Sequence, residues 1–217
     1  MIVHWDLVQG SEEWHRIKWG KIGGSSSKGL FVPSDTLLIQ LMAEHTEDFE
    51  MSDDDYISGD MQRGIELEPF HRSEIEKYIG CKLLVPGWLQ SEELPLLGIS
   101  PDGITEDLTI SWEGKAPSSK KHIATVHGKQ IPTDNIHQCL HYFTVNDKLE
   151  RHYFSSFRPE NQYPLWPKML DRDSLIDLGT KAKPNVKKVQ EWVDIAKFNT
   201  KELGLNLNIA LTSLDKI

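Results

Sequence analysis

The chain has 217 residues, of which 38% are hydrophobic and 26% are charged, and its formal net charge is −9. This length supports one large domain with a sizeable core, and the composition is that of an ordinary soluble protein. The first ten residues lack the apolar run of a signal peptide, and no stretch approaches the roughly 18 apolar residues of a membrane span. We therefore expect a single domain over residues 1–217, located in the cytoplasm and without a membrane partner.

Cysteine content and charge distribution narrow the class further. Cys81 and Cys139 are the only cysteines, which excludes a disulfide framework and a four-cysteine zinc or iron–sulfur site. The negative charge argues against a nucleic-acid partner. However, eight acids and no Lys or Arg lie between Glu44 and Asp60, so the rest of the chain carries only −9 + 8 = −1. We expect this acidic segment to be a mobile surface loop.

Helical signals dominate the first part of the chain. Residues 11–21 are typical of a short helix with Ser11 as N-cap and Gly20 at its end. The run of Gly and Ser at 23–27 then leads into a second short helix at 28–31, and small residues at such a position leave backbone N–H groups free for a phosphate. A flexible turn is the alternative reading. A further helix is predicted over residues 34–43.

Helix and strand signals alternate in the rest of the chain. We expect a helix over residues 63–79, with Pro69 tolerated near its first turn. Strand-like runs at 83–89, 96–99 and 108–116 favour an antiparallel meander. A helix at 135–145, a strand at 150–157 and a helix at 183–203 follow. This order predicts an α/β (α+β-like) fold with a central mixed β-sheet flanked by helices.

The most informative segment runs from Ser100 to Lys115. Asp102 lies in a Pro-Asp-Gly turn, and Glu113 and Lys115 are two residues apart on a predicted strand, so they share one face. Gly114 leaves its carbonyl unshielded between them. Two carboxylates can hold a divalent metal that activates water, and an ammonium can stabilise the developing charge. An ordinary turn and an exposed Glu-x-Lys pair are the alternative interpretation of these fragments.

Five segments in this order resemble the lambda-type phage exonucleases, the YqaJ-like viral recombinases of the PD-(D/E)XK nuclease superfamily. The matching segments are 14–26, 63–69, 100–103, 113–117 and Gln138. The resemblance weakens after about Phe157. It implies a restriction-endonuclease-like core and a single nuclease domain over the whole chain.

The resemblance also implies roles for individual residues. Asp102 and Glu113 would be metal ligands, together with the backbone carbonyl of Gly114, and Lys115 would position or activate the attacking water. Glu68 would reach a second metal or its waters. The implied cofactor is Mg²⁺, with Mn²⁺ as the alternative, and two ions about 4 Å apart would serve both the attacking and the leaving oxygen.

Five further positions carry open or secondary assignments. Glu66 is the competing candidate for the role of Glu68, and Gln138 is expected to orient the site. The family's pocket for the terminal 5′-phosphate maps onto Lys18, Ser25 and Ser100. Lys18 replaces an arginine of the lambda-like enzyme, so a bidentate clamp becomes a point-charge contact and the preference for a 5′-phosphorylated end is expected to be weaker.

Histidines near these residues are expected to be structural or on the surface, and nearby tryptophans are expected to be structural. The histidines are His71, His137 and His141, and the tryptophans, expected in the core or on strand faces rather than as base-stacking platforms, are Trp19, Trp88 and Trp112.

Three functions are compatible with these residues. The first is an Mg²⁺-dependent 5′-to-3′ exonuclease that degrades one strand of linear duplex DNA and leaves 3′ overhangs for recombination. For it, the resemblance implies a ring-shaped homotrimer and a single-strand annealing protein as partner. The second is a restriction-like or structure-specific endonuclease, and the third is a non-catalytic DNA-binding component of a recombination complex. Against the third, the acids and Lys115 are all present.

Overall fold

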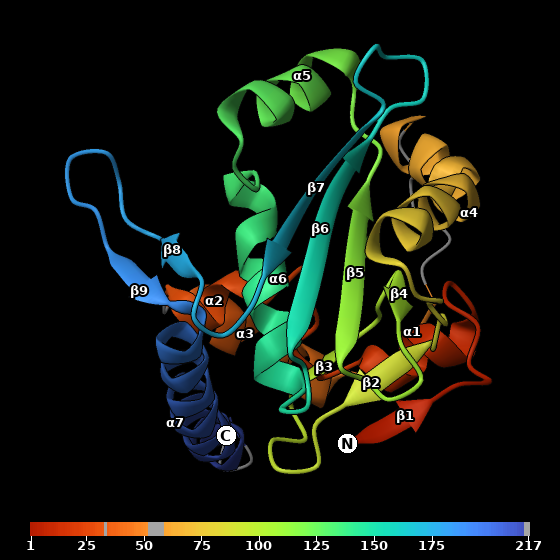
Figure 1. The fold of residues 1–217 in the computed structure, drawn as a ribbon. Helices are drawn as coiled ribbons and strands as arrows, with labels where there is room; N and C mark the ends of the chain where they lie inside the picture. Colours follow the sequence, from red (N-terminus) through yellow and green to blue (C-terminus); the bar gives the residue numbers. More distant parts are fainter. Residues whose placement is uncertain (33, 52–58, 215–217) are drawn as a thin grey trace.

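The computed structural model describes residues 1–32, 34–51 and 59–214, and Figure 1 shows its fold. The helices are α1 Glu12–Lys18, α2 Lys28–Phe31, α3 Asp35–Thr46, α4 Gly59–Ile79, α5 Ser119–Gly128, α6 Thr133–Val145 and α7 Val189–Leu214. The strands are β1 Ile2–His4, β2 Trp88–Gln90, β3 Gly98–Ile99, β4 Gly103–Ile104, β5 Ile110–Lys115, β6 Arg151–Phe157, β7 Leu165–Leu170, β8 Leu175–Asp177 and β9 Val186–Lys188.

The main sheet has the order β4-β5-β6-β7 and is mixed. Strand β5 pairs antiparallel with β4 and parallel with β6, and β6 pairs antiparallel with β7. The parallel pair requires a crossover connection, which α5 and α6 supply between β5 and β6 (Figure 1). The predicted α/β architecture, a mixed central sheet flanked by helices, is therefore confirmed.

The predicted antiparallel meander is wrong. Strands β2 and β3 do pair antiparallel, but they form a separate sheet with β1, in the order β1-β2-β3. The third strand of the expected meander, β5, belongs to the main sheet instead. After β3 the chain forms the short strand β4, which pairs antiparallel with β5. The other edge of β5 pairs with β6, which follows the crossover helices, and not with β3.

Several element boundaries differ from the expected ones. Helix α4 begins at Gly59, so Pro69 lies inside it and not near its first turn. The C-terminal helix begins at Val189, because residues 186–188 pair with β8. Strands β1, β4, β7, β8 and β9 and helix α5 were not predicted; β1, β4, β8 and β9 are only two or three residues long, too short to give a strand pattern.

The acidic segment is only partly a loop. Glu44 lies within α3 and the end of the segment lies within α4, so a loop over the whole segment is wrong. Residues 47–51 contain no helix or strand, and residues 52–58 lie outside the described part of the chain. The sequence hides this boundary because charged residues are compatible with both an exposed helix and a loop.

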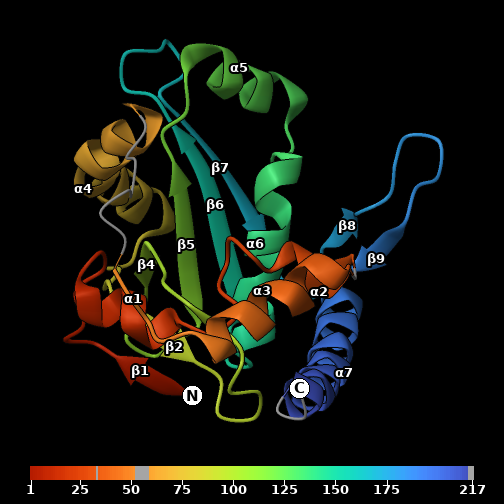
Figure 2. The same cartoon turned by 180° about the vertical axis from the view of Figure 1, so that it is seen from behind.

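The hydrophobic core lies between the main sheet and the helices α2, α3, α6 and α7, which lie together in the view from behind (Figure 2). Phe143 on α6, Phe154 on β6 and Trp192 on α7 are each at most 2% exposed and belong to this cluster. A smaller cluster around Trp112 and Ile75 packs α4 against β5 on the other side. Burial on both sides of β5 fixes the strand that carries Glu113 and Lys115.

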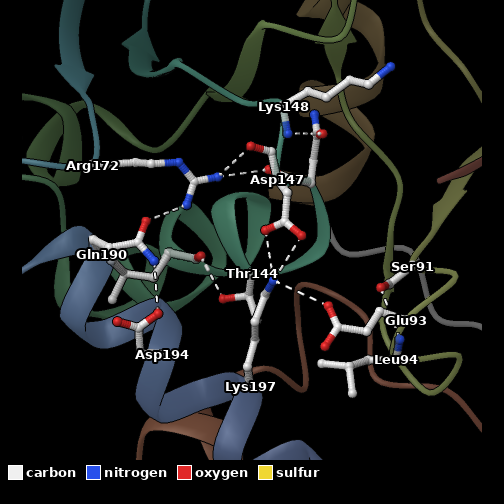
Figure 3. Close-up of polar contacts among 12 residues, drawn as sticks. Ser91, Glu93, Leu94, Thr144, Asp147, Lys148, Arg172, Gln190, Asp194 and Lys197 are labelled. Carbon is white, nitrogen blue, oxygen red and sulfur yellow. Dashed lines mark hydrogen bonds and ion pairs between the residues drawn. The ribbon is translucent and has the colours of Figure 1, made fainter.

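Polar contacts fasten α7 to the turn between α6 and β6 (Figure 3). The Nζ atom of Lys197 lies 2.7 and 2.9 Å from the two carboxylate oxygens of Asp147. Arg172 donates to the backbone carbonyls of Asn146 and Asp147 at 3.2 and 3.1 Å, and to Gln190 on α7 at 2.7 Å. Exposed ion pairs contribute little stability, so these contacts orient α7 while apolar burial holds it.

Trp88, Trp112 and Cys139 are buried side chains. Trp88 and Trp112 are at most 1% exposed and lie in the core, as predicted. Cys139 is a buried free thiol and Cys81 is a half-buried one. Among the described helices, none combines the length and the apolar character that crossing a bilayer requires.

Candidate active site

The turn between β3 and β4 places Asp102 at the open edge of β5. Strand β4 begins at Gly103, which pairs with Trp112, so Gly114 lies beyond the end of its neighbour. The Oδ2 atom of Asp102 accepts a hydrogen bond from the Gly114 amide at 2.8 Å. Because the N–H and C=O of one strand residue point to the same side, the Gly114 carbonyl also faces this open edge.

Glu113 is held from two sides. Lys115, two residues along the same strand, contacts its Oε1 atom through Nζ, as expected for side chains on one face. The hydroxyl of Tyr142 on α6 donates to its Oε2 atom at 2.6 Å. Glu113 is only 1% exposed. Burial of a carboxylate is tolerated here because both oxygens have partners, one of them a cation.

Helix α4 contributes Glu68 to the same place. Arg72, one turn later on the helix, contacts the Glu68 carboxylate and donates through Nε to the Asp102 carbonyl at 3.0 Å. Glu66 instead accepts a hydrogen bond from Gln62 at 2.8 Å on the exposed side of α4. Of the two candidate acids on this helix, Glu68 is therefore the one that the structure turns toward Asp102.

These groups border one cavity of about 820 Å³ between α4, β5, α5 and the start of α6. Its lining includes Glu68, Asp102, Gly114 and Lys115, together with His71. The structure thus gathers the acids from α4 and from the β3–β4 turn around the strand that bears the lysine. Glu113 lies directly behind this lining, in contact with Lys115.

The charges at the site perturb each other. Burial raises the pKa of Asp102 well above its ordinary value, and the negative charges of Glu113 and Glu68 raise it further. Burial lowers the pKa of Lys115, but Glu113 and Asp102 outweigh that effect and leave the pKa above its usual range. Lys115 is therefore a cation, and Asp102 sits in an environment with more negative charge than the nearby cations neutralise.

The donors present fit a hard divalent cation. They are carboxylates and a backbone carbonyl, the ligands that Mg²⁺ and Mn²⁺ prefer, and a dication would relieve the crowding of negative charge at Asp102. Within the described ranges, no group of three or more His, Cys, Asp or Glu side chains forms a ready-made coordination sphere. The Gly114 carbonyl and water would therefore complete the ligand set around Asp102 and Glu113.

A second, smaller pocket of about 270 Å³ contains Lys18 and Ser25. The Lys18 Nζ atom lies 3.2 Å from the centre of the Trp14 ring, and burial lowers the pKa of Lys18 to about 8. The acids Glu44 and Glu50 also line this pocket. Lys18 and Ser25 thus lie together as the resemblance implies, but they share the pocket with negative charge.

Ser100 does not line the Lys18 pocket. Its hydroxyl donates to the Gly87 carbonyl at 2.7 Å and accepts from the Trp14 indole N–H at 2.8 Å. Ser100 therefore supports Trp14, and through Trp14 the position of Lys18.

Gln138 packs against the glycine–serine loop and not into the larger cavity. A Cβ atom on Gly24 would lie 2.9 Å from the Gln138 Cγ atom, so this glycine allows the close approach. Ser26 and Ser27 turn their hydroxyls back to the carbonyls of Gly23 and Gly24, at 3.3 and 2.7 Å. These bonds shape the loop, of which Ser25 and Ser26 both line the smaller pocket.

Sequence reasoning missed two contacts at the site. It gave Tyr142 no role, and it did not mention Arg72 at all. Both follow a proposed site residue by one helical turn, Tyr142 after Gln138 and Arg72 after Glu68, and residues at this spacing share a helix face. The spacing was the available signal, although the partner of Tyr142 could be known only from the fold.

A mixed sheet that brings acids and a lysine to one cavity beside a helix is typical of the PD-(D/E)XK nuclease class. A family model described as the YqaJ-like viral recombinase domain matches residues 13–148. The chain therefore belongs to the YqaJ-like viral recombinase family. No protein of curated function matches the sequence.

Solved structures share the fold over nearly the whole chain. An alkaline exonuclease (LHK-Exo) from Laribacter hongkongensis is 20% identical, with a TM-score of 0.74 over 95% of this chain and 97% of that one. LHK-Exo in complex with dAMP is 21% identical, with a TM-score of 0.70 over 95% and 99% of the two chains.

Proposed function

We propose that the chain, as a single nuclease domain, is a Mg²⁺-dependent exonuclease that digests one strand of linear duplex DNA from its 5′ end and leaves 3′ overhangs for phage-type recombination. Hydrolysis of DNA phosphodiester bonds accords with membership in the viral recombinase family and with the fold shared with an alkaline exonuclease. The 5′-to-3′ direction of digestion and the choice of Mg²⁺ follow from the family resemblance.

The observation that carries the proposal is the meeting of Asp102, Glu113 and Lys115 at the open edge of β5, with Glu68 facing them from α4. Asp102, Glu113 and the Gly114 carbonyl would hold the metal. When bound, the ion would polarise the phosphodiester and lower the pKa of a water molecule. Glu68 would bind waters of a second ion, and Arg72 fixes the direction in which Glu68 points.

Lys115 supplies a positive charge beside the reacting phosphate. Its contact with Glu113 holds the ammonium beside the site, where it would position or activate the attacking water and stabilise negative charge. Tyr142 keeps the buried carboxylate of Glu113 aimed at the site by occupying its far oxygen.

At the DNA end, Lys18 and Ser25 would contact the 5′-phosphate, with Trp14 and Ser100 supporting Lys18. The proposal also includes a homotrimer and a single-strand annealing partner, as the family resemblance implies. A hydrodynamic mass equal to a single 24.9 kDa chain under native conditions would remove the trimer from it.

The test is digestion of end-labelled linear duplexes and covalently closed circles with Mg²⁺, with Ca²⁺ and with EDTA. We expect nucleotide release from linear DNA with Mg²⁺ alone, starting at the 5′ end, and no cutting of circles. Cleavage of closed circles would identify an endonuclease. Binding without digestion in every condition would identify a non-catalytic DNA-binding component.

A further inference from the structure

His71 is a buried side chain that the proposed chemistry does not yet use. It is 2% exposed, and its ring stacks on Phe157 with centroids 4.7 Å apart and meets the edge of Trp112 at 4.8 Å. A Cβ atom on Gly114 would lie 2.8 Å from the His71 Nδ1 atom and 2.4 Å from the Trp112 ring. The glycine between Glu113 and Lys115 is therefore needed to admit the imidazole.

A buried relay fixes which ring nitrogen of His71 carries the proton. The indole N–H of Trp112 donates to the Ser155 hydroxyl at 2.7 Å, and that hydroxyl lies 2.7 Å from the His71 Nε2 atom. Among the described residues, the hydroxyl hydrogen of Ser155 has no other acceptor. It therefore points to Nε2, which must be unprotonated, so the imidazole is neutral and carries its proton on Nδ1.

The Nδ1 edge faces the proposed site. His71 lines the large cavity together with Asp102, Gly114 and Lys115, and its Nδ1 atom makes no hydrogen bond to any described residue. Nδ1 is also not among the fully buried polar atoms that lack a partner in the described part of the chain, so it keeps some accessible surface. A rigid N–H donor beside Lys115 is thus left for a ligand.

We propose that His71 is a further catalytic residue, whose Nδ1–H donates a hydrogen bond to a non-bridging oxygen of the DNA phosphodiester held beside Gly114 and Lys115. The inference rests on the proposed nuclease function and adds a neutral donor to its charged groups. Because the ring is clamped between Phe157 and Trp112, the donor needs no reorganisation when negative charge develops on the phosphate.

Two substitutions at His71 separate the roles of its two nitrogens. His71→Asn places an amide nitrogen near the position of Nδ1, whereas His71→Gln places it near Nε2. With Mg²⁺, the kcat for digestion of linear duplex should be about 100-fold lower in His71→Gln than in wild type. In His71→Asn it should fall by no more than about fivefold. Thermal unfolding of both variants, which lose the same ring stacking, serves as the matched control.

Equal loss in both folded variants, or full activity in both, would overturn the proposal while wild-type digestion leaves the nuclease function intact. A wild-type protein that digests no DNA would instead defeat the proposed function. If the variants do not fold, ¹⁵N NMR of the wild-type protein shows which ring nitrogen of His71 carries the proton. A proton on Nδ1 agrees with the proposal, and a proton on Nε2 contradicts it.

Discussion

The contact between Tyr142 and Glu113 gives the sharpest prediction about how the site is supported. The two side chains are each 1% exposed and are joined by a 2.6 Å hydrogen bond, so water cannot replace the hydroxyl in Tyr142→Phe. Loss of a hydrogen bond to a buried charged group costs about 1.5–3 kcal/mol of unfolding free energy. In a chain of this length, that cost corresponds to a fall in Tm of roughly 3–12 °C.

The same substitution should weaken metal binding. Loss of a side chain that orients a metal ligand lowers metal affinity by about 10–100-fold. We therefore expect Tyr142→Phe to need about 10–100-fold more Mg²⁺ for half-maximal digestion of linear duplex. Saturating Mg²⁺ should restore most of kcat. The assay is a Mg²⁺ titration of digestion rate beside thermal unfolding without metal.

The matched control is Tyr153→Phe. Tyr153 is also buried, at 8% exposed, and its hydroxyl makes no hydrogen bond to another described residue. This variant should leave the Mg²⁺ requirement unchanged. A Tyr142→Phe variant that matches Tyr153→Phe in both stability and metal requirement would contradict the role given to the Tyr142 hydroxyl.

Three further predictions concern other groups. Asp102→Asn should reduce digestion by at least about 1,000-fold while the protein still binds duplex DNA in Ca²⁺, as measured by fluorescence anisotropy, and near-normal digestion would remove Asp102 from the site. Lys18 is a cation below its pKa of about 8, so the preference for 5′-phosphoryl over 5′-hydroxyl ends should decline from pH 7 to pH 9. This preference should be absent in Lys18→Ala. Equal digestion rates on both kinds of end in wild type would reject the assignment of the Lys18 pocket to the 5′-phosphate. Burial lowers the pKa of His141 to about 4 and that of His152 to about 3, below the unfolded value of about 6.5. Between pH 7 and pH 4.5 the unfolded chain therefore binds more protons than the folded one, so Tm should fall as the pH drops over this range. A constant Tm would contradict the assignment of these two histidines as buried and neutral.

The sequence could reveal the parts of the site that depend on local spacing. Period-two alternation placed Glu113 and Lys115 on one face, and the Pro-Asp-Gly signal placed Asp102 in a turn, as the structure has them. The mixed sheet followed from the order of helix and strand signals. The choice between Glu66 and Glu68 stayed open until the packing of α4 turned Glu68 toward the cavity.

The remaining features depend on tertiary packing. The parallel pairing of β5 with β6 sets Trp112 near Ser155, and only this register creates the relay to His71. Sequence reasoning treated His71 as structural or on the surface, and the ring is indeed buried. No local pattern indicates that Gly114 makes room for it, since the glycine serves a close approach between distant segments rather than a turn.

The most direct test of the account is the position of the metal. Anomalous diffraction from crystals soaked in Mn²⁺ should show a peak at the open edge of β5, within ligand distance of Asp102, Glu113 and the Gly114 carbonyl, that disappears in Asp102→Asn. A peak bound by other residues, or no peak at an Mn²⁺ concentration that supports digestion, would contradict the central claim that these groups form the metal site.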